Sequence, residues 1–124
     1  MFKQVGATTL RLQRLLMSTS TNVIKSAYPG PIELSMIDKI TTNLHPTYLK
    51  VTNDSIKHAH HSAIRGAFNT TESHFHLDII SDSFEGKSLP ARHRMVYSLL
   101  QDEIDNKGVH ALQMRTKTVN ENTR

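Results

Sequence analysis

Apolar residues recur every three or four positions in the segment that follows Pro31, which is the spacing of one face of an α-helix. They are Ile32, Met36, Ile37, Ile40 and Leu44. Pro46 lies two residues after Leu44 and cannot continue a helix, because it has no backbone N–H and its ring fixes φ. The pattern predicts a first helix that ends before Pro46.

Two later segments alternate apolar and polar residues, as a strand with one buried face does. From Tyr48 to Thr52, the residues Leu49 and Val51 share one side. From His74 to Ile80 the alternation is clearer, and its two sides are Phe75, Leu77 and Ile79 against His74, His76 and Asp78. We predict two strands here.

The segment that Ser88 opens has the pattern of a second helix, with Pro90 in its first turn and Gly108 after its end. A kink that divides this helix is compatible with the pattern. Its inward residues are predicted to be Leu89, Val96, Leu99, Leu100 and Ile104. His93 lies four residues after Leu89 and three before Val96, so it is predicted to turn toward the sheet.

Residues Val109–Thr118 alternate again and predict a last strand. Its two sides are His110, Leu112 and Met114 against Ala111, Gln113 and Arg115. The predicted order is α-β-β-α-β, which gives an α+β domain of two layers with the helices on one face of the sheet. The connection from Asn53 to Glu72 contains 20 residues without a periodic pattern, and loops of that length tend to be functional.

The composition limits the classes of function. With 124 residues, of which 37% are hydrophobic, the chain suits one small domain. The absence of cysteine excludes a disulfide framework, a thiolate zinc site and a cysteine nucleophile. No apolar run approaches the roughly 20 residues that span a bilayer, so no association with a membrane is expected. The motifs of nucleotide-binding proteins, metalloproteases and serine hydrolases are missing, and we predict that the protein is not an enzyme.

The excess positive charge lies at the N-terminus. The basic residues that precede the first acidic residue, Glu33, are Lys3, Arg11, Arg14 and Lys25. They account for the whole formal net charge of +4, so the chain from residue 26 onward is neutral. That neutrality does not favour nucleic acid as a partner.

Residues 1–25 contain no acidic residue, are rich in Ser and Thr, and place leucines around two arginines. This composition is typical of an amphipathic mitochondrial presequence, although a disordered basic terminus has the same charge. We predict a presequence at 1–25 that directs the protein to the mitochondrial matrix, followed by a linker at 26–31. A second start at Met17 would give a shorter cytosolic form.

Histidines supply the candidate metal ligands. His58, His60 and His61 lie close together in the long connection, where they are either ligands or a solvated tract. His110, taken alone, indicates no more than a half-buried histidine in an edge strand. The sequence by itself leaves these alternatives open.

Four separate motifs strongly resemble the BolA family, and they occur in the order of that family's pattern. They are Glu72-Ser73-His74-Phe75, the run from Ser81 to Leu89, the run from Arg92 to Tyr97, and Val109-His110-Ala111-Leu112. The resemblance covers residues 32–118 and leaves 119–124 as a C-terminal tail. It implies the order α-β-β-α-α-β, with a three-stranded sheet similar to class II KH domains. It also implies that the second helix is split into a short first piece and a longer second one.

The resemblance implies a function as well. BolA-like proteins are partners of monothiol glutaredoxins, with which they share a bridging 2Fe–2S cluster, and mitochondrial members assist the delivery of clusters to client proteins. His110 matches the family's C-terminal ligand, and His58 matches the loop ligand, where histidine resembles the BolA1 branch. His60 and His61 are alternates for the loop ligand, because they follow immediately. The other two ligands would be thiolates from the glutaredoxin cysteine and its bound glutathione.

Two departures and two alternatives accompany this interpretation. The loop is longer than in the family, through Ala63–Gly66, and Thr116–Asn120 stands where many members have proline and an aromatic residue. A nucleic-acid-binding regulator is the second hypothesis, but the chain lacks the GxxG loop with which KH domains clamp a nucleic-acid backbone. An apo adaptor that binds glutaredoxin without metal is the third.

The candidates for contact with a partner lie on the second helix. They are Arg92, His93 and Arg94, which otherwise belong to an ordinary mixed surface.

Overall fold

The computed structural model describes residues 21–58, 69 and 71–123 of the 124-residue chain. The first 20 residues of the predicted presequence lie outside this part, as do the loop histidines His60 and His61. His58 is described through its backbone only. Within the described part, no helix has the length and apolar character needed to cross a membrane.

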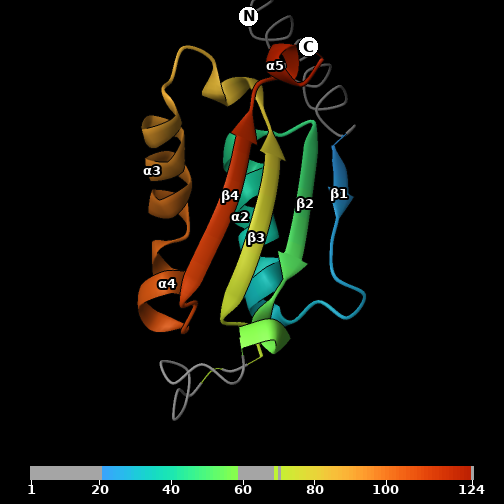
Figure 1. The fold of residues 1–124 in the computed structure, drawn as a ribbon, viewed down its shortest axis with the longest axis vertical. Coiled ribbons are helices and arrows are strands. Elements are labelled where there is room, and N and C mark those ends of the chain that lie inside the picture. Colours follow the sequence, from blue (N-terminus) through green and yellow to red (C-terminus); the bar gives the residue numbers. More distant parts are fainter. Residues whose placement is uncertain (1–20, 59–68, 70, 124) are drawn as a thin grey trace, which may run out of the picture.

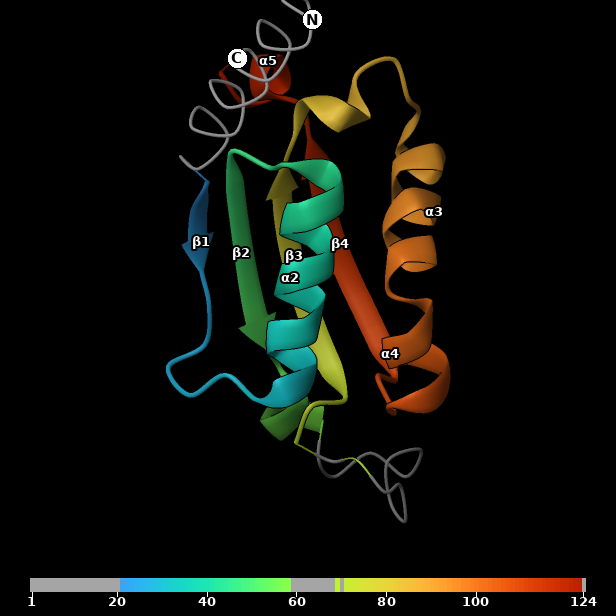
Figure 2. The same cartoon turned by 180° about the vertical axis from the view of Figure 1, so that it is seen from behind.

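A single four-stranded sheet is covered by helices on one face (Figure 1, Figure 2). The strands, in their order across the sheet, are β1 (Asn22–Ile24), β2 (Tyr48–Asn53), β3 (His74–Ile80) and β4 (Ala111–Lys117). The covering helices are α2 (Pro31–Leu44), α3 (Leu89–Leu99) and α4 (Gln101–Asn106). The short elements at the ends of the sheet are the 3₁₀ turns η1 (Ser55–His58) and η2 (Asp82–Phe84) and the helix α5 (Val119–Asn122). This arrangement confirms the α+β class, the order α-β-β-α-α-β from α2 to β4, and the helices on one face.

Alternation in β2 and β3 sends every second side chain into the core beneath the helices. These side chains share one buried cluster with residues of α2 and α3, whose members include Leu49, Val51, Phe75, Leu77, Ile79, Met36, Ile40, Leu44 and Val96. Burial of each large aliphatic or aromatic side chain contributes roughly 1.5–3 kcal/mol to stability. The opposite face of the sheet carries polar residues such as Lys50 and Asp78, and no described helix covers it (Figure 1).

The sheet has four strands where the sequence predicts three. The additional strand, β1, lies within the segment assigned to the presequence and pairs in parallel with the first half of β2. The N–H of Asn22 donates to the Thr47 carbonyl at 3.1 Å, and the Thr21 hydroxyl donates to the Pro46 carbonyl at 2.6 Å. Three residues are too few to show an alternation, which is why the sequence pattern misses this strand. Removal of residues 1–25 as one unit would remove β1 with them.

The second predicted helix is divided at Leu100 into α3, with 11 residues, and α4, with 6. The expected order of a short piece followed by a longer one is therefore wrong. The inward position predicted for Leu89 is also wrong, because Leu89 is 58% exposed while Arg92 is only 7% exposed. Arg92 lies four residues before the buried Val96 and so shares its inward face, whereas His93 is only half-buried.

Arg92 ties α3 to the end of β4 and to α5. Its Nε donates to the Lys87 carbonyl at 2.9 Å, and its Nη1 donates to the Thr116 carbonyl at 3.2 Å. Both terminal nitrogens also donate to the Glu121 carboxylate, at 2.7 and 3.1 Å. Hydrogen bonds from Arg92 first, and then from the Thr118 N–H, lower the pKa of Glu121 to about 2.

The N-terminus of α2 is capped from a distant part of the chain. The Glu72 carboxylate accepts the Ile32 N–H at 2.7 Å, which satisfies one of the donors that a helix leaves unpaired at its start. Gly30 permits this approach, because a Cβ there would lie 1.3 Å from Glu72 Oε1. Glu72 is held in turn by Asn69, whose Oδ1 accepts the Glu72 N–H at 2.9 Å. The start of α2 is thus fixed to the segment that leads into β3.

Gly30→Ala tests this cap. We expect it to lower the free energy of unfolding by about 1–2 kcal/mol, because the new methyl group displaces the Glu72 carboxylate from Ile32. Glu72→Ala should cost about 1 kcal/mol, and adding Gly30→Ala to it should cost little more, because the clash is then gone. Urea unfolding of the four chains measures the coupling. Additive effects of the two substitutions would show that the cap does not depend on Gly30.

Glu121→Gln tests the ion pair with Arg92. The pKa of Glu121 is lower in the folded chain than its ordinary value of 4.5, so the pair stabilises the fold above about pH 4.5 and this stabilisation is lost as the pH falls toward 2. The variant should therefore melt at a lower temperature than the wild type at pH 7, and the difference should shrink between pH 4.5 and 2. Asp38→Asn, at an exposed carboxylate of α2, is the control for general charge effects in these thermal unfolding experiments. A deficit of equal size at every pH would contradict the assigned ion pair.

Candidate functional site

Two histidines from neighbouring strands meet at one end of the sheet. β3 and β4 run parallel, and their register pairs His74 with Ala111. His110 directly precedes Ala111 and therefore lies beside His74, with the centres of the two imidazole rings 5.7 Å apart and the rings tilted by 36°. This pair forms the centre of the candidate site.

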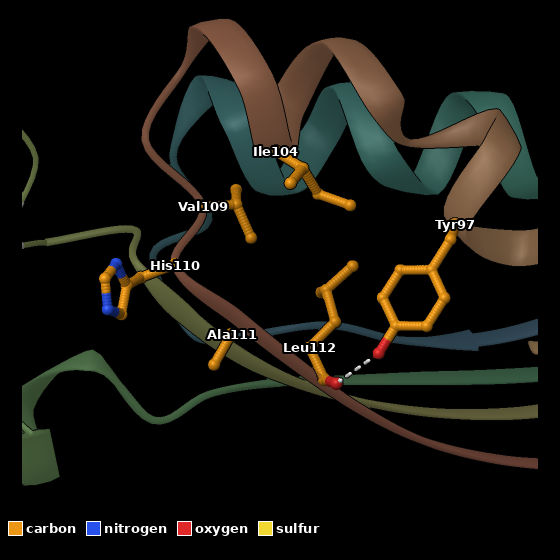
Figure 3. Close-up of a pocket in the computed structure, with 6 residues that line it drawn as sticks. All are labelled: Tyr97, Ile104, Val109, His110, Ala111 and Leu112. Carbon is orange, nitrogen blue, oxygen red and sulfur yellow. Dashed lines mark hydrogen bonds between the residues drawn. The ribbon is translucent and has the colours of Figure 1, made fainter.

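The backbone at His110 interrupts the alternation of β4. The N–H groups of His110 and Ala111 both donate to the Ser73 carbonyl, at 2.7 and 3.1 Å. Because one acceptor serves two consecutive residues, the side chains before Ala111 do not follow the strand's pattern, and Val109 is buried while His110 is exposed. Figure 3 shows the imidazole pointing away from the apolar side chains drawn beside it. The predicted position of His110 on the inner face of the strand is wrong, and its exposure makes it accessible to a second molecule.

Neighbouring serines fix the position of His74. The Ser73 hydroxyl lies within hydrogen-bond distance of His74 Nδ1, at 3.0 Å, and the tautomer of the ring decides which of the two donates. The buried Ser55 hydroxyl accepts the N–H groups of Ser73 and His74, at 2.9 and 3.2 Å. The sequence pattern places His74 only on the polar side of a strand. Its closeness to His110 follows from the register of β3 and β4, which no local pattern encodes.

Ser55 also places the start of the long loop. It is the first residue of η1, and the N–H of the preceding residue, Asp54, donates to the His74 carbonyl at 2.8 Å. η1 ends at His58, so the backbone of His58 lies at the same end of the sheet as the start of β4 (Figure 1). The imidazoles of His58 and of the alternates His60 and His61 lie outside the described part. A role for any of these three as a ligand stays a prediction.

The predicted partner contacts lie at the other end of the molecule. Arg92, His93 and Arg94 occupy the first turns of α3, at the end of the sheet opposite η1 (Figure 1). Arg92 is buried against Glu121, His93 is half-buried and Arg94 is exposed. The structure therefore does not bring this triplet to His110. A contact between the triplet and a partner stays a prediction, and Arg94 is the member whose exposure suits it.

A small cleft adjoins the backbone of His110, between α3, α4 and the start of β4 (Figure 3). Its volume is about 230 Å³, and its lining residues are Tyr97, Ile104, Val109, His110, Ala111 and Leu112. The Tyr97 hydroxyl donates to the Leu112 carbonyl at 3.2 Å, so this polar group of β4 is already bonded within the chain. Pockets for small-molecule ligands usually have volumes of about 300–1,000 Å³, so the cleft is small for a substrate site.

The side chains at this end of the sheet suit half of a metal-ligand set. Neutral imidazoles bind transition metals through one ring nitrogen, and His74 and His110 provide two such rings. Among the residues that the structure describes, no group of three or more histidine, cysteine, aspartate or glutamate side chains is arranged to hold a metal ion. Two imidazoles do not complete the four-coordinate shell typical of zinc sites or of iron in iron–sulfur clusters. The remaining ligands would have to come from outside the described residues or from a second molecule.

Comparisons with known proteins agree with this architecture. The family model described as "BolA-like protein" matches residues 40–121. The chain is 49% identical over 82 residues to SufE-like protein 1, chloroplastic/mitochondrial, of Arabidopsis thaliana, in an alignment covering 65% of this chain and 22% of the relative. It is 36% identical over 93 residues to BolA-like protein 1 of Mus musculus, covering 75% of this chain and 62% of the relative. The DNA-binding transcriptional regulator BolA of Escherichia coli is 36% identical over 84 residues, covering 68% of this chain and 72% of the relative.

A solved structure shares the fold. The BolA domain of SufE1 from Arabidopsis thaliana superposes with a TM-score of 0.66 and 40% sequence identity, covering 76% of this chain and 99% of that chain.

The chain spans less than two thirds of the length of both SufE-like protein 1 of Arabidopsis thaliana and BolA-like protein 1 of Mus musculus. The matched residues 40–121 include His58, His74 and His110 and make up more than half of the chain. The expectation drawn from the four motifs is thus confirmed, and the chain belongs to the BolA family.

Proposed function

We propose that the protein is a mitochondrial assembly and transfer factor for iron–sulfur clusters that acts with a monothiol glutaredoxin. It helps to insert 2Fe–2S clusters into client proteins, and the cluster is its cargo. The observation that carries the proposal is His110, an exposed imidazole beside a second imidazole, in a chain without cysteine. Membership of the BolA family supports an interaction factor, and no enzyme family is indicated.

The composition determines how the ligands would be divided between the two proteins. A 2Fe–2S cluster takes four ligands, and histidine replaces two of the four thiolates in Rieske-type centres. This chain can supply imidazoles but no thiolate. His110 would be one ligand, and His58, with His60 and His61 as alternates, is the sequence-based proposal for the other. The two thiolates would come from the cysteine of glutaredoxin and from glutathione, so the cluster requires a complex of both proteins.

A nucleic-acid-binding regulator is the second candidate. One relative, 36% identical to this chain, is named a DNA-binding transcriptional regulator. The chain from residue 26 onward carries no net charge, and the open face of the sheet places Asp78 between Lys50 and Arg115. Because affinity for nucleic acid depends largely on the neutralisation of phosphates, this charge pattern supports the cluster proposal over the regulator.

Import of the predicted presequence, residues 1–25, tests the proposed mitochondrial location. The name of the Arabidopsis relative includes chloroplast and mitochondrion, which supports an organellar location. A fluorescent protein fused after residue 25 should be imported into mitochondria, and replacement of Arg11 and Arg14 by glutamine should prevent import, because presequences depend on basic residues. Fluorescence microscopy distinguishes the outcomes. Diffuse cytosolic fluorescence of the unaltered fusion would rule out this location signal.

Anaerobic cluster reconstitution tests the function itself. With a mitochondrial monothiol glutaredoxin and glutathione, the chain should give a visible circular dichroism spectrum that differs from that of glutaredoxin alone. His110→Ala should abolish this difference, because one of the four cluster ligands is lost. His76→Ala, two residues beyond His74 in β3, is the matched control and should keep it. An unchanged spectrum in His110→Ala, with glutaredoxin binding intact, would indicate an apo adaptor and overturn the proposal.

A further inference from the structure

Glu33 is a buried carboxylate with one unbonded oxygen. It lies in the first turn of α2 and is completely buried. Its Oε2 accepts the Ser26 N–H at 2.9 Å, whereas Oε1 has no hydrogen-bond partner among the described residues. Within that same part of the chain, no lysine, arginine or histidine forms an ion pair with Glu33. Because a buried charge is costly unless it is paired and hydrogen-bonded, this carboxylate requires a cation or further donors.

A second carboxylate increases the negative charge at the start of α2. Glu72 is 7% exposed, and its carboxylate accepts the Ile32 N–H at 2.7 Å. The aligned peptide groups of a helix act as about half a positive elementary charge at its N-terminus. That partial charge balances only a fraction of two carboxylates. A full positive charge beside Glu33 would balance the rest.

The backbone nitrogen of Ser26 is the atom where such a charge can arise. In the intact chain it belongs to a peptide group and offers one N–H to Glu33. Hydrolysis of the preceding peptide bond would make it an α-ammonium group, which is protonated near pH 7 and has three N–H donors. The nitrogen already lies 2.9 Å from Oε2 of Glu33, so the added donors are close to both carboxylate oxygens. Hydrogen bonds between two charged groups are roughly twice as strong as neutral ones.

The bond before Ser26 lies where a peptidase can reach it. Lys25 is exposed and stands between β1 and α2, outside both elements. Exposed connecting segments are preferred sites of proteolysis. The same bond ends the predicted presequence, residues 1–25, which carries all of the chain's excess positive charge. A cut here would therefore remove the complete targeting segment.

We propose that a peptidase of the mitochondrial matrix hydrolyses the bond between Lys25 and Ser26, and that the new α-ammonium group of Ser26 pairs with Glu33. The inference goes beyond the cluster role and rests on the proposed mitochondrial location. The C–N bond breaks, and water adds its hydroxyl group to the Lys25 carbonyl carbon. The Ser26 nitrogen gains two protons, one from water and one from the new carboxylic acid, and no atom is oxidised or reduced. β1 leaves with residues 1–25, so the ion pair compensates for the contacts that β1 makes with β2.

Import of the full precursor tests the position of the cut. Isolated, energised mitochondria should shorten it to residues 26–124 with an unblocked Ser26, as measured by intact mass and N-terminal sequencing. An imported chain that is uncut, or that begins at another residue, would overturn this inference and leave the proposed cluster function standing. A precursor that is not imported would overturn both this inference and the mitochondrial location, and cluster reconstitution would still test the cluster function independently.

Glu33→Gln tests the ion pair, because glutamine keeps a hydrogen-bond acceptor and has no charge. We compare the melting temperatures of the precursor and of the processed chain recovered from mitochondria. Processing should shift the wild type upward by about 5 °C relative to the shift that it causes in Glu33→Gln. Asp38→Asn, at an exposed carboxylate of α2, is the matched control and should respond as the wild type does. Equal shifts in the wild type and in Glu33→Gln would contradict the pair.

Acetylation of the processed wild-type chain tests the same pair without a substitution in the helix. Near pH 7 the reaction favours the α-amine over lysine side chains, because the α-amine has the lower pKa. The acetylated Ser26 nitrogen keeps one N–H and loses its charge. The modified chain should melt about 5 °C below the unmodified one. An unchanged melting temperature after complete acetylation of Ser26 would overturn the inference.

Discussion

The parallel pairing of β3 with β4 is the constraint on which the site depends. Parallel strands begin at the same end of a sheet, so His74 at the start of β3 and His110 just before β4 are neighbours despite their distance in sequence. The chain must cross over between the two strands, and α3 and α4 make that crossing on the covered face (Figure 2). Arg92 fixes the far end of the crossing to β4 and α5, and the Ser73 carbonyl fixes the near end to His110 and Ala111. Movement of β4 by one residue relative to β3 would separate the two imidazoles.

The sequence predicts best those elements whose position depends on burial of one apolar face. α2, β2 and β3 follow their predicted patterns for this reason. β1 is too short to show a period, and it is placed by its parallel pairing with β2 and by hydrogen bonds to Pro46 and Thr47 just before β2. In α3, the buried residue is Arg92 and the exposed one is Leu89, because a guanidinium bonded to two carbonyls and to the Glu121 carboxylate is satisfied in the interior. Hydropathy alone cannot anticipate such an exchange.

The sequence predicts one part of the candidate site, and the other part follows only from the folded sheet. The motif around His110 identifies the residue. Its exposure follows from the Ser73 carbonyl, which accepts the N–H groups of both His110 and Ala111, and a pattern of alternating residues does not predict this. His74 becomes important only through strand register, a property of the assembled sheet. A chain that offers imidazoles and no thiolate is suited to a cluster that it cannot hold alone. In the proposed account, dependence on a thiolate-bearing partner follows directly from the composition, and β1 links the segment assigned to targeting with the folded sheet.

The central claim is that imidazole nitrogens of this chain bind the iron of a cluster shared with glutaredoxin. Electron–nuclear double resonance of the reduced complex, with only the histidines of this chain labelled with nitrogen-15, tests it most directly, because a nitrogen bound to iron couples strongly to the unpaired electron. The account predicts strong couplings from two labelled nitrogens. A complex that contains the cluster but shows no nitrogen-15 coupling would contradict it.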